Sequence, residues 1–453
     1  MNKNITALFI SFGIIIVLFS SINFTGCSDD PVSPDSQTDP SGAFTNTYTS
    51  EVAFQWYDLE IKLIKQTSGI TPPVASRALG YTGIALYESV VPGMPEYQSL
   101  KGQLNGLTTL PEINSGEVYH WPTCANAALA FIIRKLYFNA SAQNLASVDS
   151  LEEAFNLKYQ SQLSSEVFSR SKIFGESIAD AIYNWSVTDG GNEGQLHNTD
   201  PGYVPPAGTG YWVPTPPSNS PAVQPYWGDN RPFITANVTE CQPGPHAPFS
   251  TSNTSLFYTQ ALEVYSTSNK LTEDQKTIAL FWADDGGSYT PPGHSVAILL
   301  QLLNSGNSGL DFSSASLAKI GIAVSDAFIS CWRGKFTYNL LRPITYIRNY
   351  IDPSWSPFIT TPPFPEYASG HSTQSGASAQ VLSDILGYNY AFTDYTHSGD
   401  GFAPRSFNSF FDFADEAAIS RLYGGIHYRS ANENGLGKGI EIGRNVSALH
   451  FLK

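Results

Sequence analysis

The sequence predicts a mainly α-helical protein whose helices are joined by long loops. In many segments, apolar residues recur every three or four positions, which is the spacing of an amphipathic helix. No segment shows a convincing alternation of apolar and polar residues, the pattern of a half-buried strand. The chain has 453 residues, of which 42% are hydrophobic and only 14% charged. It can therefore bury a large core, as one large domain or as two or three smaller ones.

Five helices are predicted in the first half of the chain. In the first of them, Val52, Trp56, Leu59 and Leu63 follow helical spacing, and the proline pair at 72–73 stops the pattern. The same spacing recurs in four further segments. The five predicted helices cover residues 48–67, 74–91, 123–138, 144–164 and 167–186.

A long irregular segment, residues 189–249, follows these helices. It contains 12 of the 30 prolines, and its aromatic residues include Tyr203, Trp212 and Trp227. Loops of this length in compact domains are usually functional or disordered, and the aromatic residues favour a packed loop. We therefore predict that residues 189–249 cover part of the core.

Helical spacing resumes after residue 250 and continues almost to the end of the chain. The run Asp-Asp-Gly-Gly-Ser-Tyr-Thr-Pro-Pro-Gly at residues 284–293 interrupts it. The predicted helices cover residues 253–268, 272–284, 294–304, 314–334, 372–386, 412–423 and 432–449. The whole chain is thus expected to hold roughly ten or more helices, with no short-period repeat.

The N-terminus is typical of an exported lipoprotein. Lys3 precedes an apolar run over residues 7–19, and small residues come directly before Cys27. We predict a lipoprotein-type signal peptide at residues 1–27, lipid on Cys27 and a polar tether at residues 28–43. The expected location is the periplasm or the cell surface. Secretion and an uncleaved anchor are the alternatives, although the apolar run is short for a membrane span of about 20 residues.

The charge of the chain limits its partners. A formal net charge of −15 excludes a general attraction to nucleic acid or to anionic membranes. Membrane contact is expected only through the lipid anchor. An anion site in this chain must be built from local positive charge, which makes a cluster of Lys and Arg more informative.

Three further cysteines, Cys124, Cys241 and Cys331, lack the spacing of metal ligands. One disulfide between two of them is compatible with an exported protein, and the sequence leaves the pairing open. Small buried hydrophobic side chains are the alternative for at least one of the three.

Lys335 and Arg342 are the first candidates for an anion site. The segment Lys335-x6-Arg342-Pro343 places the two cations seven residues apart, which on a continuous helix is about two turns and therefore the same face. Pro343 disfavours helical geometry at Arg342, so we expect Arg342 at a helix end. Taken alone, this segment fits a solvated basic face at a helix C-terminus better.

The second motif, Ser369-Gly370-His371, precedes the helix predicted at 372–386. Ser369 fits the N-cap position, and Gly370 allows the backbone to approach a ligand closely. A helix N-terminus offers free N–H groups and a positive dipole to an oxyanion, and His371 is placed to exchange protons there. A histidine that only caps or packs at a helix start is the alternative.

The third motif is Ser420-Arg421-x5-His427. Arg421 and His427 would point in different directions on an unbroken helix, but the glycine pair at 424–425 allows the chain to bend between them. Arg421 offers a planar fork for two oxygens of a tetrahedral anion. His427 offers a neutral nitrogen that can attack phosphorus or coordinate a metal.

In this order, the three motifs resemble the signature of the vanadium-dependent haloperoxidases and of the related type 2 phosphatidic acid phosphatases and bacterial acid phosphatases. By motif, the resemblance covers roughly residues 270–450. It implies a mainly α-helical fold built from two four-helix-bundle-like halves, residues 44–250 and 251–453, in one compact domain. The anion would be held between helices of the second half.

The resemblance also implies a role for each motif residue. His427 would be the single protein ligand of one vanadium, and His371 would be the acid–base residue that deprotonates hydrogen peroxide. Lys335 would activate the peroxide for attack by a halide, which leaves as hypohalous acid and halogenates a small organic acceptor. The residues expected to hold vanadate are Lys335, Arg342, Ser369, Gly370, Arg421 and His427, and those expected to be catalytic are His371, Lys335 and Arg342.

An acid phosphatase of the same superfamily is the alternative function, with His427 as nucleophile and His371 as the acid for the leaving group. That branch commonly carries an Asp four residues after the nucleophilic His, where this chain has Ala431. A missing orienting carboxylate should weaken a nucleophile more than a metal ligand. The chain length and the run at 361–367 also favour the haloperoxidase branch. A glycan-binding surface lipoprotein is a distant third alternative, since it needs none of the anion-site residues.

The halide pocket is expected near Trp332, Arg333 and Phe364. By resemblance, Trp332 and Phe364 would line it, with plain core packing as the alternative, and Arg333 would add positive charge near the halide. Iodide or bromide is the expected substrate, since iodide is the easiest halide to oxidise. The interrupting loop, with Asp284, Asp285, Tyr289 and His294, is a further candidate for reaching the site.

Overall fold

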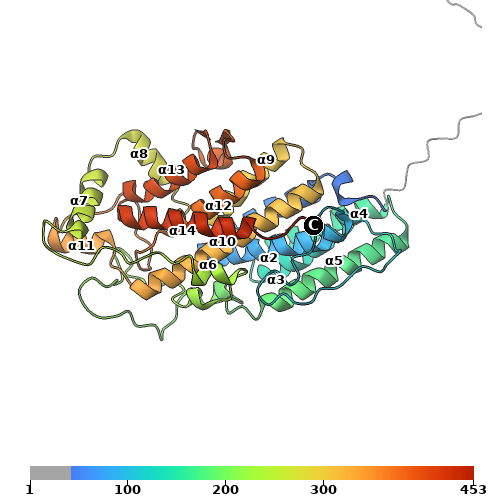
Figure 1. Ribbon diagram of the computed structural model, residues 1–453, viewed down its shortest axis with the longest axis horizontal. Coiled ribbons are helices and arrows are strands. Elements are labelled where there is room, and N and C mark those ends of the chain that lie inside the picture. Colours follow the sequence, from blue (N-terminus) through green and yellow to red (C-terminus); the bar gives the residue numbers. More distant parts are fainter. Residues whose placement is uncertain (1–41) are drawn as a thin grey trace, which may run out of the picture. The chain divides into compact units, whose positions relative to one another are not determined.

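Fourteen α-helices build residues 42–453, the part of the chain that is described by a computed structural model (Figure 1). The predicted mainly α-helical fold is confirmed. The described residues belong to one compact unit. The predicted signal peptide (1–27) and almost all of the predicted tether (28–43) lie outside the described residues, so export and lipidation stay predictions.

α2 is the central helix of the first half. The helices of this half are α1 (Glu51–Gln66), α2 (Pro72–Val90), α3 (Trp121–Leu136), α4 (Ala142–Gln160) and α5 (Ser165–Ser186). α2 is buried along almost its whole length and packs against α3 and α5, and against α10 (Leu310–Tyr338) of the second half. A Cβ atom at Gly83 would lie 2.8 Å from the carbonyl oxygen of Leu317, so α2 and α10 can approach this closely only where glycine stands.

α12 has the corresponding position in the second half. The remaining helices are α7 (Leu256–Ser268), α8 (Glu273–Phe281), α9 (Thr290–Ser305), α11 (Pro343–Tyr350), α12 (Gly370–Leu386), α13 (Phe410–Tyr423) and α14 (Arg429–Ser447). α12 packs against α10, α13 and α14. A Cβ atom at Gly439 of α14 would lie 2.0 Å from the carbonyl oxygen of Thr373. This close packing fixes the N-terminal end of α12, where the Ser-Gly-His motif lies.

Two short helices, α6 (Thr235–Thr239) and α11, and both strands are absent from the sequence-based prediction. α11 has only eight residues. The strands β1 (Phe392–Asp394) and β2 (Arg405–Phe407) pair antiparallel, with Phe392 opposite Phe407. Three residues are too few to show an alternating pattern, and eight residues give a helix little more than two turns.

Lys335 and Arg342 do not share a helix, so the same-face prediction for this segment is wrong. α10 ends at Tyr338 because Asn339 adopts the left-handed conformation, with φ of 46°. Arg342 has extended backbone (φ −73°, ψ 154°) directly before Pro343, at the N-terminus of α11. The expectation that Pro343 would place Arg342 at a helix end is confirmed. The two cations therefore reach the site from different elements.

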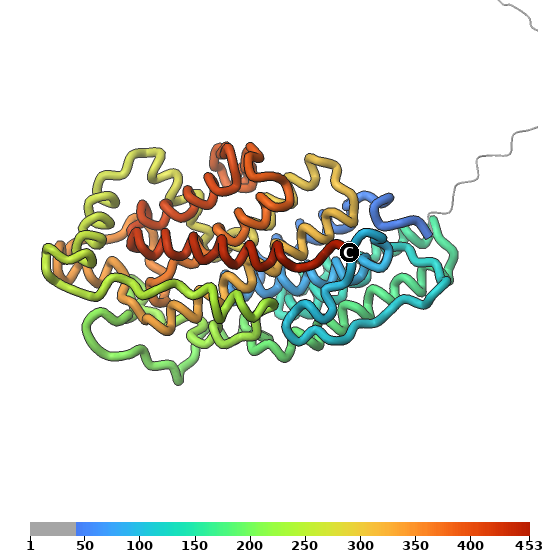
Figure 2. The backbone as a smooth tube through the Cα atoms, viewed as in Figure 1, coloured from blue at the N-terminus to red at the C-terminus, as the bar shows by residue number. Residues whose placement is uncertain are grey.

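The irregular segment 189–249 is packed, as predicted. It includes α6 (Thr235–Thr239) and two short 3-10 turns, and Figure 2 shows its green part as irregular chain. Trp212 and Trp227 are buried. The backbone N–H of Trp212 donates to the carbonyl of Asn339 (2.6 Å), and that of Val223 donates to the carbonyl of Pro363 (2.9 Å). The segment therefore covers the chain around two of the three motifs.

The described residues 42–453 contain no disulfide. Cys124, Cys241 and Cys331 are all buried and unpaired, which agrees with the buried-hydrophobe alternative. Within the same residues, α10 is the one helix long and apolar enough to cross a membrane, and 89% of its apolar window is buried inside the protein. α10 is thus the core helix on which both halves pack.

Candidate active site

The second and third motifs meet at one cavity of about 260 Å³, which Gly370, His371, Arg421 and His427 line. Lys335, Arg342 and Ser369 are buried and are not among its lining residues. One wall of the cavity comes from α10, a second from the start of α12, and a third from the connection between α13 and α14. The loop after α8 and the segment 189–249 complete it. The titratable residues in its lining are Asp284, Asp285, His371, Arg421 and His427.

Lys335 lies in the last turn of α10 and is fully buried. Its Nζ donates to the carbonyl oxygens of Pro365 (3.0 Å), Glu366 (3.0 Å) and Ala368 (2.5 Å). Burial lowers the pKa of Lys335 to about 8, because desolvation disfavours the charged form. Lys335 is therefore still mainly a cation at neutral pH, and it holds the chain before His371 against α10.

Arg342 connects the second and third motifs. Its Nε donates to the carbonyl of Phe364 (2.8 Å), and its Nη1 donates to the carbonyl of Ile426 (2.9 Å). Nη1 also lies 3.2 Å from Nε2 of His427. Nη2 is buried without a hydrogen-bond partner among the described residues. A buried donor of a charged group without an acceptor is costly, so this nitrogen indicates a place for an anionic ligand.

Arg421 lies near the C-terminal end of α13 and lines the cavity. Its Nε donates to Oγ of Ser420 (2.9 Å), and its Nη2 donates to the carbonyl of Ala279 (3.2 Å). Burial lowers the pKa of Arg421 to about 10, opposed by the charges of Asp284 and Asp285. These contacts aim the guanidinium at the cavity and keep it charged.

The site has an excess of buried positive charge. Lys335, Arg342 and Arg421 are each at most 1% exposed. Within residues 42–453, none of the three forms a salt bridge with a carboxylate, although the charge of Glu366 acts on Lys335 and Arg342 and those of Asp284 and Asp285 act on Arg421. Buried charges are normally paired. Three cations around one cavity therefore fit a multiply charged oxyanion, which supplies the missing negative charge.

His427 presents one ring nitrogen as an acceptor. The chain bends between Arg421 and His427 at Gly425, whose φ is 78°, a conformation that favours glycine; the predicted bend is confirmed. Nε2 of His427 faces Arg342, which can only donate, so Nδ1 carries the proton and donates to Oε1 of Glu366 at 2.8 Å. Burial and the charge of Arg342 lower the pKa of His427 well below its ordinary value. The neutral imidazole is therefore ready to coordinate a metal or to attack phosphorus.

Glu366 orients His427, and the sequence reasoning did not assign it this role. Its Oε1 also accepts the backbone N–H of Tyr428 at 2.9 Å. Burial raises the pKa of Glu366 to about 7, opposed by the charges of Arg342 and Lys335. The orienting carboxylate that is missing at Ala431 is thus supplied from another segment. An acidic residue inside an otherwise apolar run, five positions before His371, was the available signal.

His371 lies in the first turn of α12. The N-cap prediction is confirmed, because Oγ of Ser369 accepts the backbone N–H of Ser372 at 3.4 Å. Nε2 of His371 has no hydrogen-bond partner among the described residues. Burial and then the charge of Arg421 lower the pKa of His371 well below its ordinary value, opposed by hydrogen bonds to the backbone of Ala283. His371 is therefore a neutral base at the cavity wall.

Two of the three residues predicted for the halide pocket line the cavity. Trp332 and Phe364 both line the cavity, with ring centroids 4.9 Å apart. The placement of Arg333 is wrong: its side chain is exposed and lines a separate surface depression beside Gln242. Successive residues on an α-helix point about 100° apart. Since Trp332 faces the cavity, Arg333 must face away from it.

The loop after α8 reaches the site through two of its candidate residues. Asp284 and Asp285 line the cavity, where their charges act on Arg421. Tyr289 lines a different depression beside Lys65. His294, on α9, is buried and contacts Asp284 at 3.0 Å.

Comparisons with known proteins agree with this geometry. Residues 315–451 match the family model described as the VCPO second helical-bundle domain. The vanadium chloroperoxidase of Curvularia inaequalis is 23% identical over 482 residues, covering 82% of this chain and 77% of that protein.

Solved structures give the same result. A bacterial vanadium-dependent iodoperoxidase is 36% identical, with a TM-score of 0.81, and the match covers 90% of this chain and 98% of that one. An apo-type bacterial vanadium-dependent chloroperoxidase is 16% identical with a TM-score of 0.64, over 84% of this chain and 94% of that one, which indicates the fold. From the 36% identity over nearly the full length of a relative, the chain belongs to the vanadium-dependent haloperoxidase family.

Proposed function

We propose that this protein binds one vanadate in the cavity and uses hydrogen peroxide to oxidise iodide or bromide to hypohalous acid. The observation that carries the proposal is the group of three buried cations without salt bridges beside the acceptor nitrogen of His427. This donor set fits a tetrahedral oxyanion with a metal at its centre. When bound, vanadium would act as a Lewis acid that keeps its oxidation state.

The residues of this chain divide the remaining work. Nε2 of His427 would be the protein ligand, held in its tautomer by Glu366. Lys335, Arg342 and Arg421 would neutralise the oxygens, and Ser369 and the Gly370 amide would hydrogen-bond them at the N-terminus of α12. His371, neutral and with a free Nε2, would take the proton from peroxide. Lys335 would then add positive charge where the halide attacks.

Two observations support the halide part of the proposal. The structurally similar protein at 36% identity is described as an iodoperoxidase. The aromatic wall of Trp332 and Phe364 also suits a large, weakly hydrated anion better than a polar wall would.

Phosphatase activity is the second candidate, because Glu366 supplies the carboxylate that a nucleophilic His427 would need. The decisive experiment measures two activities of the purified protein, with and without vanadate. We expect peroxide-dependent oxidation of iodide and bromide by the vanadate-loaded protein and none by the apoprotein. Hydrolysis of a phosphate ester without peroxide-dependent halide oxidation would overturn the proposal.

Replacing Glu366 with Gln should weaken vanadate binding by roughly 10–100-fold, the usual cost of losing an outer-shell partner of a metal-ligating His. Gln keeps the size and one acceptor but removes the charge that makes His427 a stronger donor to the metal. The dissociation constant from a vanadate titration is the measurement, with Glu153→Gln on exposed surface of α4 as matched control. Equal affinity in both variants would show that Glu366 does not tune His427.

A further inference from the structure

Two histidines and an aspartate converge beside the vanadate cavity, and no step of the proposed function uses them. They are Asp284 in the loop after α8, His294 on α9 and His397 in the 3-10 turn Thr396–Asp400. All three side chains are buried. We propose that Asp284, His294 and His397 form a second metal centre, which binds one divalent transition metal of the zinc type.

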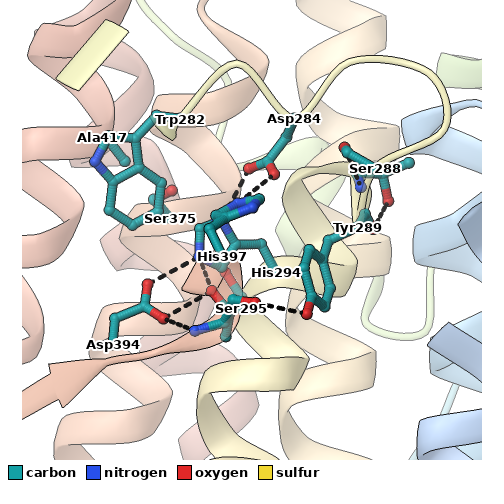
Figure 3. A network of polar contacts seen from close by, with 12 residues as sticks. Trp282, Asp284, Ser288, Tyr289, His294, Ser295, Ser375, Asp394, His397 and Ala417 are labelled. Carbon is teal, nitrogen blue, oxygen red and sulfur yellow. Dashed lines mark hydrogen bonds and ion pairs between the residues drawn. The ribbon is translucent and has the colours of Figure 1, made fainter. Parts of the chain in front are cut away.

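The geometry points all three side chains at one position (Figure 3). Nδ1 of His294 lies 3.0 Å from Oδ2 of Asp284, and Nε2 of His397 lies 3.3 Å from Oδ1 of Asp284. The ligand atoms all lie within 4.8 Å of one another. Ligands bound at about 2.0–2.1 Å around a tetrahedral zinc are roughly 3.3–3.4 Å apart, which is close to the two distances that separate Asp284 from the histidines.

The far nitrogen of each histidine contacts another carboxylate. Nε2 of His294 lies 2.9 Å from Oδ2 of Asp394, and Nδ1 of His397 lies 2.9 Å from Oδ2 of Asp400. Metal-ligating histidines almost always donate their other N–H to a carboxylate, carbonyl or water, which fixes the tautomer that presents the free nitrogen to the metal. Both histidines are therefore oriented as ligands, each by its own aspartate.

A metal-free ion-pair network is the competing explanation. In that case both histidines would only contact the carboxylates of Asp284, Asp394 and Asp400. However, Oδ1 of Asp284 and Nε2 of His397 are buried and contact each other at 3.3 Å, and neither atom makes a hydrogen bond of good geometry in the described residues. A divalent ion between them satisfies both atoms and neutralises more of the negative charge.

The donor set selects the class of metal. Two imidazole nitrogens with one carboxylate oxygen suit zinc and neighbouring transition metals, whereas Ca²⁺ and Mg²⁺ prefer oxygen ligands throughout. Trp282 stacks on the His294 ring at a centroid distance of 4.7 Å, so the ligand is held rigidly before any ion arrives. The fourth position would be taken by water.

This centre would hold the loop that shapes the vanadate site. Asp284 directly follows Ala283, whose backbone hydrogen-bonds His371, and precedes Asp285, whose charge acts on Arg421. An ion on Asp284 would tie this loop to α9 and to the turn Thr396–Asp400. Its role would be structural, and it would exist whether or not the protein oxidises halides.

The test measures metal content of the full chain without a histidine tag, first stripped with a chelator and free of vanadate. After equilibrium dialysis against ZnCl2 alone, elemental analysis should find one tightly bound zinc per chain. At 100 times the dissociation constant, zinc should raise the melting temperature by about 3 °C for a unit of this size, and CaCl2 should not. No zinc above background, or an equal rise with calcium, would overturn the proposal.

Variants identify the ligands. Asp284→Asn, which keeps the side-chain shape, and His397→Gln should each weaken zinc binding by at least 10-fold. His450→Gln, which changes an exposed histidine, should bind zinc as the unaltered chain does. Circular dichroism identifies a variant that fails to fold, and the second ligand variant then decides. Equal zinc binding by all three folded variants would mean adventitious zinc and would refute the site.

Discussion

The variant His427→Ala is expected to bind no measurable vanadate and to show no peroxide-dependent halide oxidation. Nε2 of His427 is the acceptor nitrogen at the centre of three buried cations, and Glu366 holds its tautomer. Loss of an outer-shell partner costs roughly 10–100-fold in metal affinity, and loss of the ligand itself should cost more.

A vanadate titration and a halide-oxidation assay on the same preparation measure both effects. His450→Ala is the matched control, because it removes an exposed imidazole. In this variant Glu366 still accepts a hydrogen bond from the backbone N–H of Tyr428. We therefore expect the variant to fold, and circular dichroism checks this. Vanadate binding that survives in a folded His427→Ala protein would refute the assignment of the ligand.

The variant His371→Ala is expected to keep most of its vanadate affinity while its turnover falls by about 10²–10⁴-fold, the usual contribution of a general base. Nε2 of His371 faces the cavity without a partner, and its lowered pKa keeps the ring neutral. It contributes a proton acceptor and no charge, so the anion should lose little by its removal.

The measurement separates the dissociation constant of vanadate from kcat, with iodide and peroxide saturating. His371→Gln should resemble His371→Ala in turnover, because an amide can donate and accept hydrogen bonds but cannot take up a proton at this pH. If both variants lost vanadate to the same extent as His427→Ala, the two histidines would not have the different roles assigned to them.

The helices of this protein could be predicted from sequence, whereas connections between distant segments could not. Helical spacing and the Ser369 cap located α12, and the glycine pair located the bend before His427, because each depends on local chemistry. The separation of Lys335 from Arg342 depends on the left-handed conformation of Asn339, which the spacing of charged residues does not reveal.

The site, like the fold, could be predicted where local chemistry decides and could not be predicted where distant segments meet. Of the seven motif residues, Gly370, His371, Arg421 and His427 line one cavity, whereas Lys335, Arg342 and Ser369 are buried outside its lining. Glu366 was missed because its partner, His427, is 61 residues away, so no short-range spacing connects them. Arg333 was misplaced because it was assumed to lie in the pocket like its neighbour in sequence, Trp332. One step along α10 turns its side chain away from the cavity.

The covering segment 189–249 forms a part of the cavity wall that is separate from the anion-binding residues. Val223, in this segment, contributes to the wall and accepts a hydrogen bond from Nε1 of Trp332 at 3.3 Å. The charges that hold the anion come from helix ends and their connections, where packing tolerates few changes. A surface loop tolerates insertions and substitutions far better. Substitution at Val223 should therefore alter the cavity wall while the residues that hold the anion stay unchanged.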